Sequence, residues 1–265
     1  MLGSSCLGSL AMLAMVGACA ASPVDWSNER SAATILSHPA LRADGTLVSD
    51  TLAQLAARVE VPGPRCPSSL VLARGGSRLF AAWWTVRPDS SARLLVARSD
   101  DGGARWGAAV LVDTTDTSVS GCRRAPPSIA ADSASGYVHV AYALRGREGP
   151  GLFFSHSMDA GGMFHEPVPI VYGERPGRTS VAADGDRVVV AFEDPNSTTP
   201  RIGLALSRTM GHIFEERILP VSSDNGAASR PLAAVRGRHI AVAWEQRATN
   251  DDAPAVLAIR AGTLH

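Results

Sequence analysis

The sequence predicts an all-β protein, a β-propeller of about four four-stranded blades, with a fifth blade as the alternative. Two observations lead to this fold. Four units of similar pattern recur along residues 67–260 at intervals of roughly fifty residues. Each unit contains short runs rich in Val, Ile, Leu and aromatic residues, separated by Gly, Pro, Asp and Ser. Such runs are typical of strands, and repeated units of four strands are typical of propeller blades.

Each unit offers its strands in the same order. The first strands cover residues 67–73, 127–132, 179–184 and 231–236. The second strands, which end in an aromatic residue, cover 78–84, 137–142, 187–192 and 239–244. The third strands cover 92–98, 151–157, 201–207 and 255–260, and the fourth strands cover 107–113, 166–172 and 216–222.

The last unit has no fourth strand of its own. Because an unpaired edge strand is a liability, we expect a strand from the other end of the chain to cover it. Residues 57–61 resemble the other fourth strands, so we predict a propeller over 57–265 that follows a tether over 21–56. The alternative is a fifth, degenerate blade built from 31–60, although 49–56 has the capping residue and apolar spacing of a short helix.

A turn motif, S-x-D-x-G-x-x-[WF], joins the third strand to the fourth. Its copies begin 58 and 50 residues apart, and Thr replaces the acid in the third. The motif residues are Ser99, Asp101, Gly103 and Trp106, then Ser157, Asp159, Gly161 and Phe164, and then Ser207, Thr209, Gly211 and Phe214. The glycines permit positive φ, and the Ser and Asp side chains bond nearby amides. We therefore predict a structural turn whose aromatic residue packs between sheets, and no metal loop.

This motif in this position resembles the Asp-box of the sialidase (BNR-repeat) superfamily, over about residues 67–260. The resemblance implies a propeller fold, and it implies exo-sialidase activity only where the catalytic residues are also present. A sialidase uses three arginines, an Asp acid/base and a Tyr–Glu nucleophile pair, for which Tyr172 and Glu174 are the candidates. The Arg-Ile-Pro signature of the family is absent, because Ser37 stands where its arginine would be.

Arginine recurs just before the first strand of every unit. These residues are Arg65, Arg123 with Arg124, Arg178 and Arg230. First strands line the channel of a propeller, so we expect the guanidinium groups to converge near its mouth, where they would suit a carboxylate or another anion. Acidic residues follow the second strands on the same face, as Glu193, Asp194 and Glu245. The alternative is a set of solvated ion pairs without a ligand.

The N-terminal residues and the cysteines of the sequence indicate export. Residues 1–20 are apolar and uncharged and end in Ala18-Cys19-Ala20, a pattern of signal cleavage, while Cys19 also fits a lipidation site. We expect a periplasmic, secreted or outer-membrane lipoprotein location. In an oxidising compartment, Cys66 and Cys122, which precede the first strands of adjacent units, are expected to form a disulfide.

The net charge and the positions of the histidines exclude several classes of partner and cofactor. The formal net charge is zero, so neither nucleic acid nor a membrane surface is expected as a partner, apart from a lipid anchor. The seven histidines form no cluster along the sequence, and we predict no metal and no cofactor. We predict a binding module for an anionic glycan, a small anion or an exported partner protein. The alternatives are an exo-sialidase-type glycoside hydrolase acting on sialic acid or a related sugar acid, and a non-catalytic scaffold.

Overall fold

The computed structural model describes residues 22–35, 66–248 and 255–265, and these form strands in four separate antiparallel sheets. We name the sheets blades I to IV in chain order. Within the described residues no helix is long and apolar enough to span a membrane. Several predictions concern residues outside the described ranges and stay predictions. They are the export signal with Cys19, the residue Arg65, and the stretches 49–56 and 57–61.

The strands follow the predicted order. Blade I contains β3 (Val71–Gly75), β4 (Arg78–Val86), β5 (Ala92–Ser99) and β6 (Val110–Asp113), preceded by a short 3-10 helix, η1 (Pro67–Ser69). Blade II contains β7 (Ser128–Ala131), β8 (Val138–Gly146), β9 (Gly149–Ser157) and β10 (Val168–Tyr172). Blade III contains β11 (Thr179–Asp184), β12 (Arg187–Glu193), β13 (Ile202–Ser207) and β14 (Leu219–Pro220). Blade IV contains β15 (Ala227–Arg236), β16 (His239–Arg247) and β17 (Val256–Leu264).

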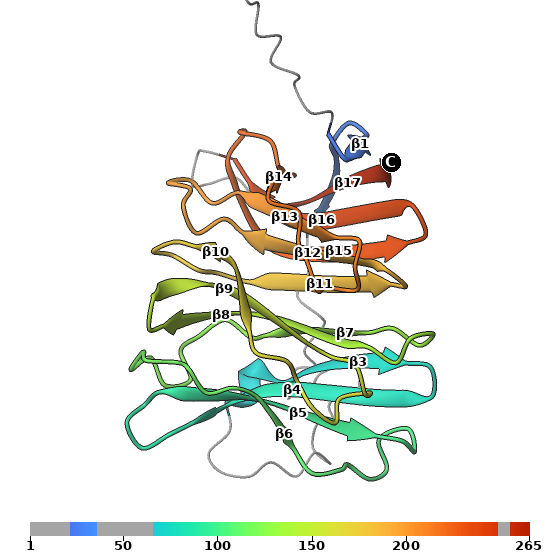
Figure 1. Ribbon diagram of the computed structural model, residues 1–265. Coiled ribbons are helices and arrows are strands. Elements are labelled where there is room, and N and C mark those ends of the chain that lie inside the picture. The colour runs from blue at the N-terminus through green and yellow to red at the C-terminus, as the bar shows by residue number, and fades with distance from the viewer. Residues whose placement is uncertain (1–21, 36–65, 249–254) are drawn as a thin grey trace, which may run out of the picture.

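The blades lie face to face in chain order, as Figure 1 shows from blade I at the bottom of the view to blade IV at the top. Within each of the first three blades, consecutive strands are hydrogen-bonded neighbours. No strand pairing among the described residues joins one blade to the next. The all-β, four-bladed propeller predicted from the sequence is thereby confirmed.

An N-terminal strand completes blade IV, but a different one from that predicted. The edge of β17 pairs with β1 (Val24–Trp26) near its C-terminal end and with β2 (Arg30–Ile35) near its start. The predicted closure of the last blade by an N-terminal strand is confirmed, and the strands that pair with β17 are β1 and β2. Residues 57–61, which we predicted for this place, lie outside the described residues. β1 and β2 lie within the range 21–56 that we predicted as a tether, and β2 pairs with blade IV. Most of the range 31–60, the alternative fifth blade, lies outside the described residues.

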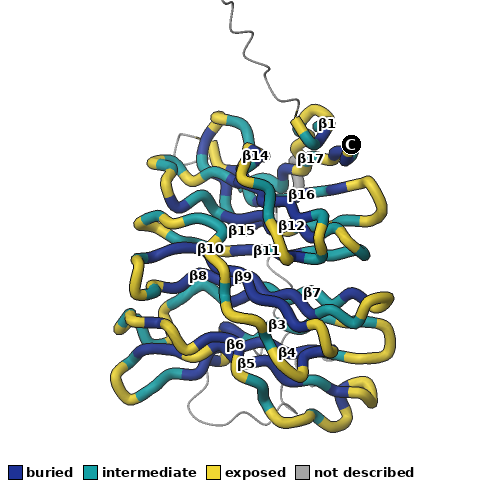
Figure 2. The backbone as a smooth tube through the Cα atoms, viewed as in Figure 1, coloured by how far each residue is buried: buried dark blue, intermediate teal, exposed yellow. Residues whose placement is uncertain are grey.

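The core lies between the sheets, and Figure 2 shows many buried residues along the strands of neighbouring sheets. Alternate residues along a strand point to opposite faces of a sheet. From β4, Trp84 packs between blades I and II in a cluster with Val140 and Tyr142 of β8. From β16, Trp244 packs against Leu204 of β13. Fully burying such a side chain contributes on the order of 1.5–3 kcal/mol, so interblade contact stabilises the propeller.

Candidate functional site

A cavity of about 440 Å³ lies where the first strands of all four blades approach one another. Its wall is formed by residues 71–72 of blade I, 126–129 of blade II, 178–181 of blade III, and 230–232 with Trp244, Glu245 and Leu257 of blade IV. First strands lining a central space are typical of a propeller. The cavity therefore occupies the place at which the sequence predicted that charged loops would converge.

Two of the predicted arginines line this cavity, and one acid connects them. Arg178 precedes β11, and Arg230 lies in an irregular part of β15. The backbone amide of Arg178 donates to Oε2 of Glu193 at 3.0 Å, and the amide of Arg230 donates to Oε1 at 2.8 Å. Glu193, at the end of β12, thus holds the backbones of blades III and IV at the rim of the cavity.

Local backbone geometry adapts to this bridge. A Cβ atom added to Gly177 would lie 2.1 Å from Oε2 and 2.9 Å from Cβ of Glu193, so a larger residue there would displace the Glu193 side chain. Arg230 has φ of +54°, a left-handed conformation that is unfavourable for a residue with a side chain. Such conformations persist where surrounding contacts impose them, and they concentrate at binding sites.

The guanidinium groups of Arg178 and Arg230 differ in whether a carboxylate neutralises their charge. Arg230 forms an ion pair with Glu245, in which the two atoms lie 2.9 Å apart. Among the described residues, the side chain of Arg178 has no hydrogen-bond or ion-pair partner, although its residue is exposed and lines the cavity. Both oxygens of Glu193 accept backbone amides and not the Arg178 side chain. Because Arg230 is paired with Glu245, Arg178 is the arginine of this cavity that is best able to bind an added anion.

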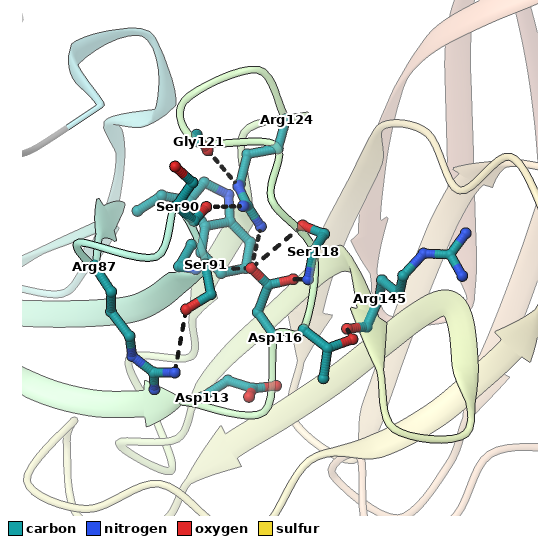
Figure 3. A network of polar contacts seen from close by, with 12 residues as sticks. Arg87, Ser90, Ser91, Asp113, Asp116, Ser118, Gly121, Arg124 and Arg145 are labelled. Carbon is teal, nitrogen blue, oxygen red and sulfur yellow. Dashed lines mark hydrogen bonds and ion pairs between the residues drawn. The ribbon is translucent and has the colours of Figure 1, made fainter.

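Arg124 does not join this cluster, which corrects the prediction for it. Its guanidinium is buried and donates to Oδ2 of Asp116 at 2.7 Å, and to the carbonyl groups of Gly121 and Ser90, as Figure 3 shows. It also lies over the ring of Trp84, 5.5 Å from the centroid. Three of its five N–H groups have protein partners, and the side chain is only 7% exposed, so Arg124 is a structural residue.

Two other predicted members also lie away from the cavity. Arg123 is exposed in the loop between β6 and β7 and is not part of the cavity wall. Asp194 accepts hydrogen bonds from the amide of Asn196 and the hydroxyl of Ser197, 3.0 and 2.7 Å away, and so shapes a turn. Of the predicted ligand-binding residues, the cavity therefore brings together Arg178, Arg230 and Glu245 over a support from Glu193.

The predicted nucleophile pair is not formed. Tyr172 lies in β10, the outermost strand of blade II, and its hydroxyl donates to Glu148 rather than to Glu174. This hydrogen bond to a carboxylate raises the pKa of Tyr172, which opposes its ionisation. Glu174 is exposed and lies 3.9 Å from Arg145. The prediction that Tyr172 and Glu174 act together is wrong, because the Tyr172 hydroxyl has another partner.

The Asp-box motifs form hydrogen-bonded turns. In the first, Ser99 Oγ donates to Oδ1 of Asp101 at 2.9 Å and accepts the amide of Gly103 at 2.8 Å. The amide of Arg105 and the hydroxyl of Ser99 lower the pKa of Asp101 to about 2. An acid of such low pKa holds no proton to donate near neutral pH, so Asp101 has the properties of a turn acceptor and not of a catalytic acid.

The second motif repeats this geometry with Ser157, Asp159 and Gly161, at 2.7 Å and 2.8 Å. In the third, Ser207 Oγ accepts the amide of Gly211 at 3.1 Å, and Thr209 Oγ1 takes over the acceptor role of the acid. As predicted, Phe164 packs between blades I and II, and Phe214 packs between blades II and III. Trp106 differs, because it packs with residues of blade I alone.

The predicted disulfide is present. Cys66 and Cys122 are bonded, with their Cα atoms 5.2 Å apart. Cys66 precedes η1 of blade I, and Cys122 lies in the loop that leads to blade II. The bond therefore fastens the connection between the first two blades.

Four histidines form a cluster that the sequence did not reveal. His139 and His156 lie on β8 and β9, and the ring of His156 has its centroid 4.7 Å from that of His165 and 4.6 Å from that of His212. Both ring nitrogens of the buried His139 lack a hydrogen-bond partner among the described residues. No three side chains of the described residues are arranged to hold a metal ion. The prediction that the histidines do not cluster is wrong in space.

Sequence spacing hides this cluster because the four histidines come from two strands and two different connections. His139 and His156 face each other across two paired strands, at the register His139–His156. His165 and His212 come from the second and third Asp-box regions. Strand pairing combined with the Asp-box register would have identified the cluster.

No protein-family model and no curated protein matches the chain. Among solved structures, phage phi92 endosialidase is similar with a TM-score of 0.54 and 10% identity, over 73% of this chain and 35% of that one. The Hadza microbial sialidase Hz136 has a TM-score of 0.49 and 20% identity, over 74% and 46%. The NanB sialidase of Streptococcus pneumoniae has a TM-score of 0.47 and 14% identity, over 76% and 31%.

The chain therefore has a sialidase-like β-propeller fold. It spans less than half the length of each of these three proteins. At such low identity the likeness concerns the fold, and the function of a propeller depends on the residues at its own site.

Proposed function

We propose that this protein is a binding module that holds a small anion at the rim of its central cavity. The observation that carries the proposal is the placement of Arg178 and Arg230 on one cavity wall, with both backbones fixed by Glu193. A guanidinium group can donate two parallel hydrogen bonds to a carboxylate. The anionic glycan and the partner protein considered above would present the same kind of charge to this rim.

A glycoside hydrolase is the alternative, because the solved structures of similar fold include sialidases. Glycoside hydrolysis needs a nucleophile and an acid on opposite sides of the scissile bond. Behind the cavity wall, both oxygens of Glu193 accept the backbone amides of Arg178 and Arg230, and Glu245 in the wall is paired with Arg230. Tyr172 is hydrogen-bonded to Glu148 on an outer strand. These contacts favour binding over catalysis.

Isothermal titration calorimetry with simple carboxylates tests the proposal. Arg178→Gln is expected to weaken carboxylate binding by about tenfold or more, since it removes a charge-assisted hydrogen bond. Arg123→Gln is the matched control, because it removes an exposed arginine outside the cavity wall. Equal affinities for both variants and the native protein would refute the anion site. Hydrolysis of a fluorogenic sialoside that disappears in Arg178→Gln would instead establish the hydrolase.

We also propose that the protein is exported, with residues 1–20 as the signal. The disulfide between Cys66 and Cys122 supports this location, because disulfides persist in oxidising compartments. Mass spectrometry of the mature N-terminus is expected to find either a lipidated Cys19 or a chain that begins after Ala20. A full-length chain in the cytoplasmic fraction would contradict export.

A further inference from the structure

We propose that the ligand of the central cavity is a monoanion with an apolar body, such as an aromatic or branched aliphatic carboxylate, rather than a polyhydroxylated sugar acid. The inference rests on the proposed function, because it assumes that Arg178 binds an anion. It names the class of molecule that the rest of the cavity accepts.

Apolar side chains from all four blades form most of the cavity wall. They include Leu72 of blade I, Ile129 of blade II, Val181 of blade III, and Leu232 and Leu257 of blade IV. Leu232, two residues after Arg230, is 67% exposed, so its side chain is accessible to a ligand. An apolar group seated between these side chains removes their surface from water, which is favourable. The wall therefore attracts the non-ionic part of a ligand when that part is also apolar.

The uncharged polar groups of the wall are already engaged by the protein. Thr179 Oγ1 donates to the carbonyl of Ala141 at 2.9 Å, and Ser128 Oγ lies 3.0 Å from that same hydroxyl. Ser180 Oγ accepts the amide of Ala233 at 2.9 Å. The several hydroxyl groups of a sugar would lose their water and find few new partners, which is unfavourable.

The charges of the rim limit the ligand to a single negative charge. Arg178 is the one guanidinium without a partner among the described residues that line the cavity, since Arg230 is shared with Glu245. The carboxylates of Glu193 and Glu245 lie at the same rim and repel further negative charge. A carboxylate satisfies this balance better than a phosphate dianion does.

The size of the cavity agrees with a small molecule. Its volume of about 440 Å³ falls within the range of about 300–1,000 Å³ that is common for small-molecule sites. One ring with a short carboxylate arm has suitable dimensions. In this arrangement the carboxylate binds Arg178 at the rim, and the ring contacts Leu232.

Calorimetric titration of the full chain with 3-phenylpropionate, its amide, glucuronate and N-acetylneuraminate tests the inference. We expect 3-phenylpropionate to bind about tenfold more tightly than either sugar acid, and the uncharged amide to bind at least about tenfold more weakly than its parent acid. Leu232→Gln is expected to weaken 3-phenylpropionate several-fold and to leave glucuronate unchanged. Ile213→Gln, at a residue that is 69% exposed in the third Asp-box, is the matched control and should change neither.

The outcomes separate this inference from the proposed function. If a sugar acid binds as tightly as 3-phenylpropionate and Arg178→Gln weakens both, the anion site stands and the apolar ligand class is refuted. If no carboxylate binds, or if Arg178→Gln has no effect, both are refuted. Loss of 3-phenylpropionate binding in Leu232→Gln but not in Ile213→Gln supports the inference, provided that both variants unfold at the temperature of the native protein.

Discussion

Asp116 and Arg124 form a buried ion pair, 2.7 Å apart, inside the loop that connects blade I to blade II. Their side chains are only 1% and 7% exposed. Oδ2 of Asp116 also accepts the amide of Ala92, the first residue of β5, at 2.7 Å. Because the Arg124 guanidinium lies over Trp84 in the core, this one pair fastens the loop to blade I from two sides.

Removal of one partner of this pair is expected to destabilise the fold strongly. Asp116→Ala leaves the buried guanidinium of Arg124 without its counter-charge and should lower the free energy of unfolding by about 3–5 kcal/mol. Urea denaturation followed by tryptophan fluorescence measures the change. Asp100→Ala is the control, since Asp100 forms exposed ion pairs with Arg78 and Arg98 and should cost no more than about 1 kcal/mol. Equal losses in the two variants would refute the structural role of Arg124.

The disulfide between Cys66 and Cys122 is expected to stabilise the fold by restricting the unfolded chain. The two residues are 56 positions apart, and closing a loop of this size contributes about 2–4 kcal/mol. The double variant Cys66→Ser/Cys122→Ser should therefore unfold at a lower urea concentration than the oxidised protein. Reductant should lower the midpoint of the native protein and leave that of the double variant unchanged. A reductant effect of the same size on both would contradict the prediction.

The Asp-box acids are expected to affect stability and not ligand binding. Oδ1 of Asp159 accepts the hydroxyl of Ser157 and the amides of Gly162 and Met163. Asp159→Ala removes this acceptor and should cost about 1–3 kcal/mol of unfolding free energy. The affinity of the folded protein for carboxylates, measured by calorimetry, should stay within twofold, about 0.4 kcal/mol. A variant that unfolds like the native protein but no longer binds would show that the turn belongs to the site.

The repeated strands were predictable because a strand that is buried on both faces needs a continuous apolar run, as in β4, β8 and β12. A strand buried at alternate residues needs an alternating pattern, as in β16. The strand that completes blade IV was not predictable, because β1 has only three residues and its pairing depends on the free edge of β17. Strand patterns record burial but do not record which edge a short strand joins.

The binding residues were predictable only in part, for a related reason. Sequence position identifies the loop of an arginine, but the direction of a long side chain depends on partners that are distant in the chain. Arg124 turns toward Asp116, whereas Arg178 remains at the cavity. The polar run over residues 113–118 contains the acid that decides this difference. An acidic residue in a loop of short polar side chains is compatible with solvent exposure, so sequence alone did not mark it as buried.

The histidine cluster predicts that the protein loses stability in acid. Burial lowers the pKa of His139 to about 3 and that of His156 to about 4, from the ordinary value of 6.5. His165, His212 and the carboxylate of Asp132 act on the same group of rings, and Asp132 only partly offsets the effect of burial on His139.

The sign follows from proton uptake on unfolding. Between pH 6.5 and the lowered pKa values the unfolded chain binds more protons than the folded protein, so the free energy of unfolding falls as the pH decreases. Above pH 6.5 the neutral histidines make their full contribution to the free energy of unfolding. At pH 5, His139 alone is expected to lower the free energy of unfolding by about 2 kcal/mol. Urea denaturation at pH 7 and pH 5 measures the loss.

His139→Phe tests the assignment, because phenylalanine fills the same site beside Phe154 and Tyr137 and cannot be protonated. The variant should lose less stability than the native protein between pH 7 and pH 5, and it also removes two buried nitrogens that lack partners. His239→Phe is the control, since His239 is an exposed residue at the start of β16. If His139→Phe and the native protein lose the same free energy of unfolding on acidification, the acid sensitivity arises elsewhere.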